Sequence, residues 1–398
     1  MKYPWLRPLK AKALQQIAQK TGIQSSGTKA VLVERLEGEL APLIIPLRTQ
    51  HDAENDGAPK KHTKKRSDNN DGIRLLSIDM GIRNLAFAVL HAPSLSSHSS
   101  LSTVSSETGT PKDKSKSKEG NNTITLTAWK RLSIPDLCHA QHHQHQHHDQ
   151  EGTSSLITTT TPKSNSKSRE TKTKAKEDFS PNLYARHAYT LIATLLTTYS
   201  PTHILIERQR FRTGGGSAVQ EWTIRVGVLE GMLYAVLETV NSSGLFSSSG
   251  GKVQVFPVEP GRVSRFWGEG EEVGDSGDGD GEVVKKTKRR KNVRDVKKMK
   301  IGLVRGWLSS SDSYSVVGNG YGCRRVVIGD DEVRKLANSF LEKCEGKRRI
   351  KKADGEDGED SMDIGKLDDL ADCLVQGVTW LEWQRMREKI VRDGGINL

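Results

Sequence analysis

The chain has 398 residues with a hydrophobic share of 34%, and 61 Lys and Arg against 49 Asp and Glu give it a formal net charge of +12. A hydrophobic share this low predicts that much of the chain is unfolded, and the basic balance favours a polyanionic partner such as nucleic acid. No apolar run approaches the roughly 18 to 20 residues of a membrane span, and no signal-peptide core follows Met1, so we expect a soluble protein with no membrane partner. The four cysteines have no zinc-knuckle or redox spacing, and we expect them to be free thiols.

The first 45 residues are predicted to form a helix, a turn and a second helix, because apolar residues recur at helical spacing on both sides of a polar, Gly-containing break at 21 to 27. The pattern resembles the SAP motif, a small helical DNA-binding module, at Leu14, Gly22, Gly27, Lys29, Leu32, Arg35 and Leu36. The amides at the start of the second helix, with Lys29 and Arg35, are then expected to meet DNA phosphates. An ordinary helical hairpin is the alternative.

Several segments have the composition of unfolded chain. They are a basic linker at 46–71 and low-complexity insertions near 93–121, 135–178, 268–290 and 309–325. Six histidines lie between 139 and 148, and we interpret them as low-complexity sequence rather than as a metal site.

The rest, 72–392, is predicted to be one catalytic domain. Its predicted elements are strands at 73–79, 84–91 and 123–134, a helix at 181–198, a strand at 202–207, a helix at about 218–240, a strand at 252–258, and helices near 294–308 and 366–390. A meander of three strands followed by alternating helix and strand is the order of the RNase H-like fold. We therefore expect an α/β domain with a mixed five-stranded sheet flanked by helices.

Two acidic residues end apolar strands of this predicted sheet. Asp79 ends the first strand and Glu207 ends the fourth, and these strands are neighbours in the RNase H-like order. Carboxylates buried side by side repel each other, and the usual remedy is a bound divalent cation.

A third acidic motif opens the last predicted helix, where Asp368, Asp369 and Asp372 share one face. Acids at the start of a helix also suit its dipole and can cap it, which is the alternative role for Asp369. Oxygen ligands without Cys or His favour Mg²⁺ or Mn²⁺, and two such ions per site would support phosphodiester hydrolysis. We expect Asp79 to bridge both ions, Glu207 to hold one, and Asp372 with Asp368 to hold the other, with Asp369 as a cap or an outer partner.

The three acidic motifs resemble those of a known family. Ser-Ile-Asp-Met-Gly-Ile-Arg-Asn-Leu-Ala at 77–86, Ile-Glu-Arg-Gln-Arg-Phe-Arg at 206–212 and Lys-Leu-Asp-Asp-Leu-Ala-Asp at 366–372 look like the fungal mitochondrial Holliday-junction resolvases, which are cruciform-cutting endonucleases related to bacterial RuvC. Segments 258–267 and 298–308 support the match. The resemblance implies a Mg²⁺-dependent homodimer that cuts two opposed strands of four-way junction DNA in mitochondrial DNA recombination and segregation.

Basic and polar residues near these motifs are expected to bind the DNA backbone. They are Arg83, Arg208, Gln209, Arg210, Arg212, Arg262, Arg265, Lys298 and Lys300, in addition to Lys29 and Arg35. The apolar helix after Glu207 is expected to form core and, in part, a dimer interface.

An acid-poor N-terminus, whose first acidic residue is Glu34, favours a mitochondrial (matrix) address, although a DNA-binding helix pair has the same bias. The basic run from Lys285 to Lys300 is interpreted as a DNA-contacting patch. It also resembles a nuclear-localisation signal, which makes the nucleus the alternative location. Three other functions stay open: a noncatalytic SAP-containing DNA-binding scaffold, an RNase H-like nuclease acting on another nucleic acid structure, and an actin-like ATPase, for which further glycine-rich phosphate loops are missing.

Overall fold

The structure, a computed structural model, describes a set of ranges that leaves out most of the predicted insertions. The described residues are 2–41, 43, 72–93, 123–134, 180–209, 221–244, 252–268, 293–309, 317–318, 321–322, 325–346 and 366–395. The predicted linker at 46–71 and the histidine-rich run at 139–148 lie outside them. Among the described helices, none has the length and apolar character that a membrane crossing requires.

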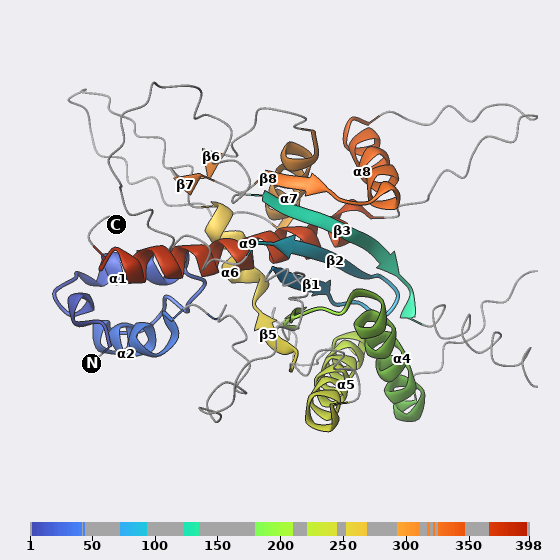
Figure 1. Ribbon diagram of the computed structural model, residues 1–398, viewed down its shortest axis with the longest axis horizontal. Helices are drawn as coiled ribbons and strands as arrows, with labels where there is room; N and C mark the ends of the chain where they lie inside the picture. The colour runs from blue at the N-terminus through green and yellow to red at the C-terminus, as the bar shows by residue number, and fades with distance from the viewer. Residues whose placement is uncertain are drawn as a thin grey trace, which may run out of the picture.

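A mixed sheet forms the centre of the molecule (Figure 1), with its strands in the order β5-β4-β1-β2-β3-β8. Its strands are β1 (Ile73–Asp79), β2 (Leu85–Ala92), β3 (Thr123–Leu132), β4 (His203–Glu207), β5 (Gln254–Val258) and β8 (Arg325–Ile328). Strand β2 is antiparallel to β1 and β3, while β1 with β4, β4 with β5, and β3 with β8 pair in parallel. The meander followed by β4 and β5 confirms the expected RNase H-like order.

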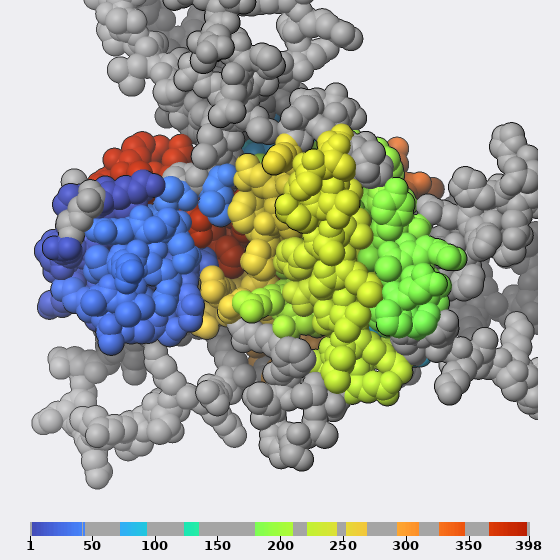
Figure 2. All heavy atoms as spheres, turned by 90° about the horizontal axis from the view of Figure 1, so that it is seen from below, coloured from blue at the N-terminus to red at the C-terminus, as the bar shows by residue number. Residues whose placement is uncertain are grey.

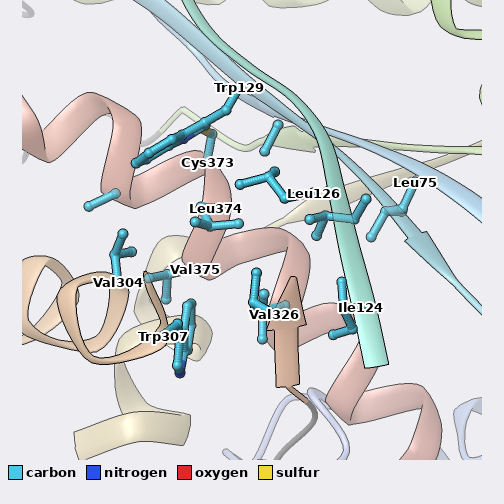
Figure 3. Close-up of a cluster of buried hydrophobic side chains, with 14 of the residues drawn as sticks. Leu75, Ile124, Leu126, Trp129, Val304, Trp307, Val326, Cys373, Leu374 and Val375 are labelled. Atoms are coloured by element: carbon cyan, nitrogen blue, oxygen red, sulfur yellow. The ribbon is translucent and has the colours of Figure 1, made fainter. Parts of the chain in front are cut away.

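Helices cover both faces of the sheet, because neighbouring residues of its apolar strands point to opposite sides. On one face, Leu76 and Ile78 pack with α4 (Pro181–Tyr199) and α5 (Glu221–Ser243). On the other, Leu75 packs in a cluster with residues of α9 (Leu367–Arg392), α6 (Pro260–Gly268), α7 (Val293–Ser309) and α8 (Asp331–Cys344). Figure 3 shows part of this second cluster, where Trp129 of β3 and Trp307 of α7 lie on either side of α9.

Helix α9 is buried around most of its circumference, since it contacts β1 and β2 on one side and α6 and α7 on the other. At Gly377 it comes so close to the sheet that a Cβ there would lie 2.7 Å from Leu90 Cδ1 and 3.2 Å from Ser77 Cβ. The tight approach brings the acidic N-terminal turns of α9 beside the end of β1.

The structure adds elements that the sequence did not predict. A sixth strand, β8, follows the predicted surface insertion and extends the expected five-stranded sheet beyond β3. Helix α8 then begins after Asp330, whose side chain accepts hydrogen bonds from Glu332 N at 2.8 Å and Val333 N at 3.4 Å. A short two-stranded ribbon joins β6 (Val317–Gly318) and β7 (Tyr321–Gly322).

The N-terminal module has the predicted helix, turn and helix, α1 (Ala11–Lys20) and α2 (Lys29–Glu39), preceded by a 3-10 turn at Pro4–Leu6. It is docked on the C-terminal half of α9 (Figure 1), and Met386 and Ile390 of α9 belong to the same buried cluster as Leu14 and Leu36. The N-terminal module therefore completes its hydrophobic core with side chains of α9.

Polar contacts fix the turn between α1 and α2 to α6 and α9. Buried Arg387 of α9 donates from Nε to Thr21 O at 2.9 Å, and Arg262 of α6 donates from Nη1 to Gly22 O at 3.1 Å. Arg265 Nη1 donates to Ser25 Oγ at 3.1 Å. In the space-filling view the module lies directly against α6 (Figure 2).

Candidate active site

Two carboxylates meet at one edge of the sheet because β1 and β4 run in parallel and end together. The register pairs Ile78 with Ile206, so Asp79 and Glu207 follow side by side. Their side chains are hydrogen-bonded, and burial, followed by this hydrogen bond and by the charge of Glu207, raises the pKa of Asp79 well above its ordinary value. In the absence of a cation Asp79 therefore retains its proton into the pH range where isolated carboxyls are ionised.

The N-terminal turns of α9 bring three further carboxylates to this edge. Lys366 occupies the N-cap position without a side-chain cap, and Asp368 and Asp369 lie in the first turn. Asp369 therefore does not occupy the N-cap position itself. Asp372 follows one turn later, and its charge and that of Asp369 also raise the pKa of Asp79.

Each of these three carboxylates has a basic partner from another element. Lys297 Nζ of α7 contacts Asp368 Oδ2, and Lys300 Nζ of α7 lies 2.8 Å from Asp372 Oδ1. Arg131 Nε of β3 lies 3.3 Å from Asp369 Oδ2. The cations offset the cost of gathering five acids at the edge of a buried sheet.

The basic partners affect the three acids unequally. Burial raises the pKa of Asp368, but the hydrogen bond and charge of Lys297 outweigh it and the net pKa is lowered. The pKa of Asp372 is raised, because burial exceeds the opposing effect of Lys300. The pKa of Asp369 is also raised, by burial and by the charge of Asp368, with Arg131 opposing. Repulsion among the acids therefore remains only partly compensated.

The donor set fits a hard divalent cation, since it consists of carboxylate oxygens and one hydrogen-bonded acid pair that such an ion would relieve. Over the described ranges, however, no three acidic, His or Cys side chains stand together as the ligands of an ion do. Asp372 is turned toward Lys300 and Asp368 toward Lys297. Metal binding at this edge would require these carboxylates to leave their lysines.

The predicted DNA-binding residues fall into different settings. The side chain of Arg208 is 62% exposed and reaches only to within 4.0 Å of Glu259, so it is accessible at the rim of the acidic cluster. Gln209 donates its backbone N–H to Glu230 Oε2 at 3.2 Å. The guanidinium of Arg83 lies 5.5 Å from the centre of the Trp222 ring. Lys29 and Lys298 are exposed, while Arg210 and Arg212 lie outside the described residues.

Other predicted DNA contacts are engaged within the protein. Lys300 is 8% exposed and paired with Asp372, so the expectation that it lies on the DNA surface is corrected. Arg262 and Arg265 hold the α1–α2 turn of the N-terminal module instead of lining a free surface, because its carbonyl and hydroxyl oxygens lie within their reach. Arg35 donates to Gln24 O at 2.6 Å and Ser26 O at 2.8 Å from the other side of that turn.

Lys297 and Arg131 are not among the site residues predicted from the sequence. Lys297 lies in a basic run that was interpreted as a DNA-contacting or targeting segment, and charge alone does not reveal its acidic partner. Arg131 is placed by strand register, since Ala86 pairs both with Asp79 and with Arg131. Only a correct register of the meander, including its irregularity at Val89 and Leu90, could have predicted it.

Comparison with known proteins gives matches over both parts of the chain. Residues 75–390 match the family described as Mitochondrial resolvase Ydc2 / RNA splicing MRS1, and residues 9–41 match the SAP domain. Cruciform cutting endonuclease 1, mitochondrial, of Schizosaccharomyces pombe is 47% identical over 60 residues, which are 15% of this chain and 23% of that protein. The protein of the same name from Saccharomyces cerevisiae is 26% identical over 192 residues, 48% of this chain and 50% of that protein.

The chain thus spans half or less of the length of these curated relatives. Among solved structures, the crystal structure of the yeast mitochondrial Holliday junction resolvase Ydc2 has a TM-score of 0.47 and 18% identity, covering 98% of this chain and 99% of that one.

Proposed function

Because the chain belongs to the family of the mitochondrial resolvase Ydc2 and the RNA-splicing protein MRS1, we propose that it is an endonuclease that resolves four-way DNA junctions by metal-dependent phosphodiester hydrolysis. The observation that carries this proposal is the acidic edge: Asp79 and Glu207 in contact at the ends of parallel strands, with Asp372 close enough for its charge to act on Asp79. A scaffold without catalysis has no use for carboxylates gathered at such a cost.

Asp79, Glu207, Asp372 and Asp368 would hold the metal, which we propose to be Mg²⁺ or Mn²⁺, two per site. When bound, such ions supply an activated water and stabilise charge on the leaving oxygen. Asp369 stays an outer partner, held by Arg131.

The basic partners have a consistent place in this chemistry. In the metal-free protein Lys297 and Lys300 neutralise Asp368 and Asp372. With Asp368 serving as a metal ligand, the half-exposed ammonium group of Lys297 would be free to face the anionic DNA backbone, whereas Lys300 is buried and stays within the protein. Arg208, exposed directly after Glu207, is placed to bind a phosphate flanking the scissile bond.

The test uses the full chain with Mg²⁺ or Mn²⁺ and three labelled substrates: a synthetic four-way DNA junction, a linear duplex of the same sequence, and a structured RNA. We expect cuts in two opposed strands of the junction and none in the duplex. Binding of the junction without any cutting would refute the enzyme and leave a DNA-binding scaffold. Preferential binding of the RNA would instead favour the RNA-splicing branch of the family.

Symmetrical cutting requires two active sites, and α5 offers a surface for a homodimer. Ile224 and Val228 are exposed on it by 49% and 42%. Gly227 and Gly231, one turn apart, have open space where a Cβ would lie, so the chain's own packing does not demand glycine there. Glycine inside a helix costs up to about 1 kcal/mol relative to alanine.

These features fit close helix packing against a second copy of the same face. The glycines, Ile224 and Val228 lie along a hollow of about 440 Å³, and Figure 2 shows α5 at the surface of the molecule. The hollow is also lined by Thr223 and Tyr234 and, at its polar end, by Arg208, Gln209 and Glu230. A two-fold axis would place the same patch on both sides of the contact. We propose that α5 forms the centre of this dimer.

A charged residue in the dimer surface should separate the subunits. We expect Val228→Glu to raise the dimer dissociation constant by about a hundredfold, because two like charges would face each other without solvent. Sedimentation velocity measures the change, and junction cutting should become single-strand nicking. Tyr189→Glu, which changes an exposed side chain of α4, is the matched control. An unaltered dimer in Val228→Glu would place the interface elsewhere.

The curated relatives carry the word mitochondrial in their names, and we propose a mitochondrial location for this chain, in the matrix where its DNA substrate would lie. Cell fractionation of the tagged protein tests this, and recovery in the nuclear fraction alone would contradict it.

A further inference from the structure

The separation of Asp79 and Asp372 depends on how α9 is seated on β1, because the two acids belong to different layers of the fold. Asp79 ends β1, and Asp372 lies in the second turn of α9. A shift of the helix by a fraction of a turn along the strand would move one carboxylate several ångströms from the other. Something must therefore fix the register of helix on strand.

Hydrogen bonds of Gln376 and Ser77 between α9 and β1 form a unit that fixes this register. Gln376 Nε2 donates to Ser77 Oγ at 3.1 Å and to Ile78 O at 3.2 Å, and Ser77 Oγ donates to Cys373 O at 2.8 Å. Gln376 is 3% exposed and Ser77 is fully buried. Both N–H groups of the amide are used, and the serine hydroxyl donates once and accepts once.

The unit is placed one residue from each acid. Ile78, whose carbonyl accepts from Gln376, directly precedes Asp79, and Cys373, whose carbonyl accepts from Ser77, directly follows Asp372. Gly377 permits the close approach that these bonds need, since any side chain there would meet Ser77 and Leu90.

A buried polar residue without a positioning role would have different hydrogen-bond partners, and Thr379 of the same helix is an example. Thr379 is also fully buried, but its hydroxyl donates to Val375 O of its own helix and accepts from Trp267 Nε1 of α6 at 2.7 Å. Neither of these hydrogen bonds reaches β1 or the acids. Gln376 differs because both of its donors cross to the strand that carries Asp79.

We propose that Gln376, together with Ser77, is a positioning residue that sets the distance between Asp79 and Asp372 and thereby the affinity of the acidic edge for divalent metal. This inference rests on the proposed metal-dependent function and adds a determinant that is not itself a ligand. Outer partners that orient metal ligands typically contribute 10- to 100-fold to metal affinity.

The experiment measures Mn²⁺ binding to the full chain by titration calorimetry without DNA, comparing the wild type, Gln376→Met and Thr379→Val. We expect Gln376→Met to bind Mn²⁺ about 10- to 100-fold more weakly, because the substitution keeps the volume but removes both bonds to β1. Thr379→Val should bind Mn²⁺ as the wild type does. Junction affinity in EDTA should be the same for all three, since the DNA-contacting residues are unchanged.

Three results would contradict the proposed role of Gln376. Mn²⁺ affinity within twofold of the wild type in a folded Gln376→Met would overturn the role of Gln376 while the proposed function stands. An equal loss in Thr379→Val would reduce the effect to general loosening of α9. No Mn²⁺ binding by the wild type would overturn the proposed function and this inference with it.

If Gln376→Met fails to fold, Ser77→Ala removes the shared hydroxyl in a smaller change and is expected to weaken Mn²⁺ binding by about tenfold.

Discussion

Replacing Asp79 with asparagine is expected to lower the rate of junction cutting by about a thousandfold or more, which corresponds to roughly 4 kcal/mol of transition-state stabilisation. Asparagine keeps the size of the side chain but cannot carry the charge that a metal ligand at the end of β1 needs. Junction binding measured in EDTA should be unchanged, because Asp79 is among the acids and not among the exposed cations.

The same substitution should stabilise the metal-free protein above the acidic range. The pKa of Asp79 is raised in the folded state, so the folded protein binds more protons than the unfolded chain between the ordinary carboxyl pKa and the raised value. The contribution of Asp79 to stability is present at low pH and is lost as the pH rises through the folded pKa. Asp79→Asn removes this pH dependence, and its melting temperature without metal should exceed that of the wild type at pH 8 and lose that advantage near pH 4.

Adding Mg²⁺ should reverse the order of the melting temperatures, so that the wild type melts above Asp79→Asn. The wild type gains about 2.7 kcal/mol at a free Mg²⁺ concentration one hundred times its dissociation constant, whereas Asp79→Asn gains far less. Asp331→Asn, which changes a carboxylate of α8 whose side chain is 96% exposed, is the control and should behave as the wild type in all assays. Equal metal-induced stabilisation of wild type and Asp79→Asn would remove Asp79 from the metal site.

The sequence predicted the site best where a charged residue directly follows apolar residues that are expected to be buried. Asp79 and Glu207 could be predicted as a pair because each ends an apolar strand and the strand order makes the strands neighbours. Asp368, Asp369 and Asp372 followed from helical spacing. Such signals are local, so they survive long insertions elsewhere in the chain.

The partners of these acids could not be predicted, since they come from distant parts of the chain. Lys297 is separated from Asp368 by 71 residues, and nothing in either segment specifies the pairing. Positive charge near the site predicts an oxygen acceptor without identifying it, which is why Arg262 and Arg265 were expected on DNA. Their acceptors are Gly22 O and Ser25 Oγ of the docked module.

The docked N-terminal module leads to the second large expected effect, from Gly22→Ala. Gly22 has φ of +70°, and a Cβ there would lie 2.2 Å from the Trp383 ring of α9. Backbone strain together with displacement of a buried indole should cost roughly 2 to 5 kcal/mol. We expect the module to separate from α9, which would uncover Trp383, Met386 and Ile390.

Hydrogen exchange can show that the loss is confined to this interface. Amides of the C-terminal half of α9 should exchange faster in Gly22→Ala, since local opening follows the loss of buried contacts. The N-terminal turns of α9 with Asp368 and Asp372 are held separately, by α7 and by β1. The cutting rate at saturating junction should therefore stay close to that of the wild type while junction affinity falls, because the module no longer binds DNA as a fixed part of the enzyme.

Gly27→Ala separates this effect from loss of the module's own fold. Gly27 also has positive φ, at +123°, but its Cβ would meet only Val31 of the same module, at 3.1 Å. It should lower the stability of α2 without accelerating exchange in α9. If both substitutions accelerate exchange in α9 equally, docking depends on the folding of the module rather than on the contact of Gly22 with Trp383. If neither lowers junction affinity, the module makes no contribution to DNA binding, and the basic surface beside Glu207 must account for it alone.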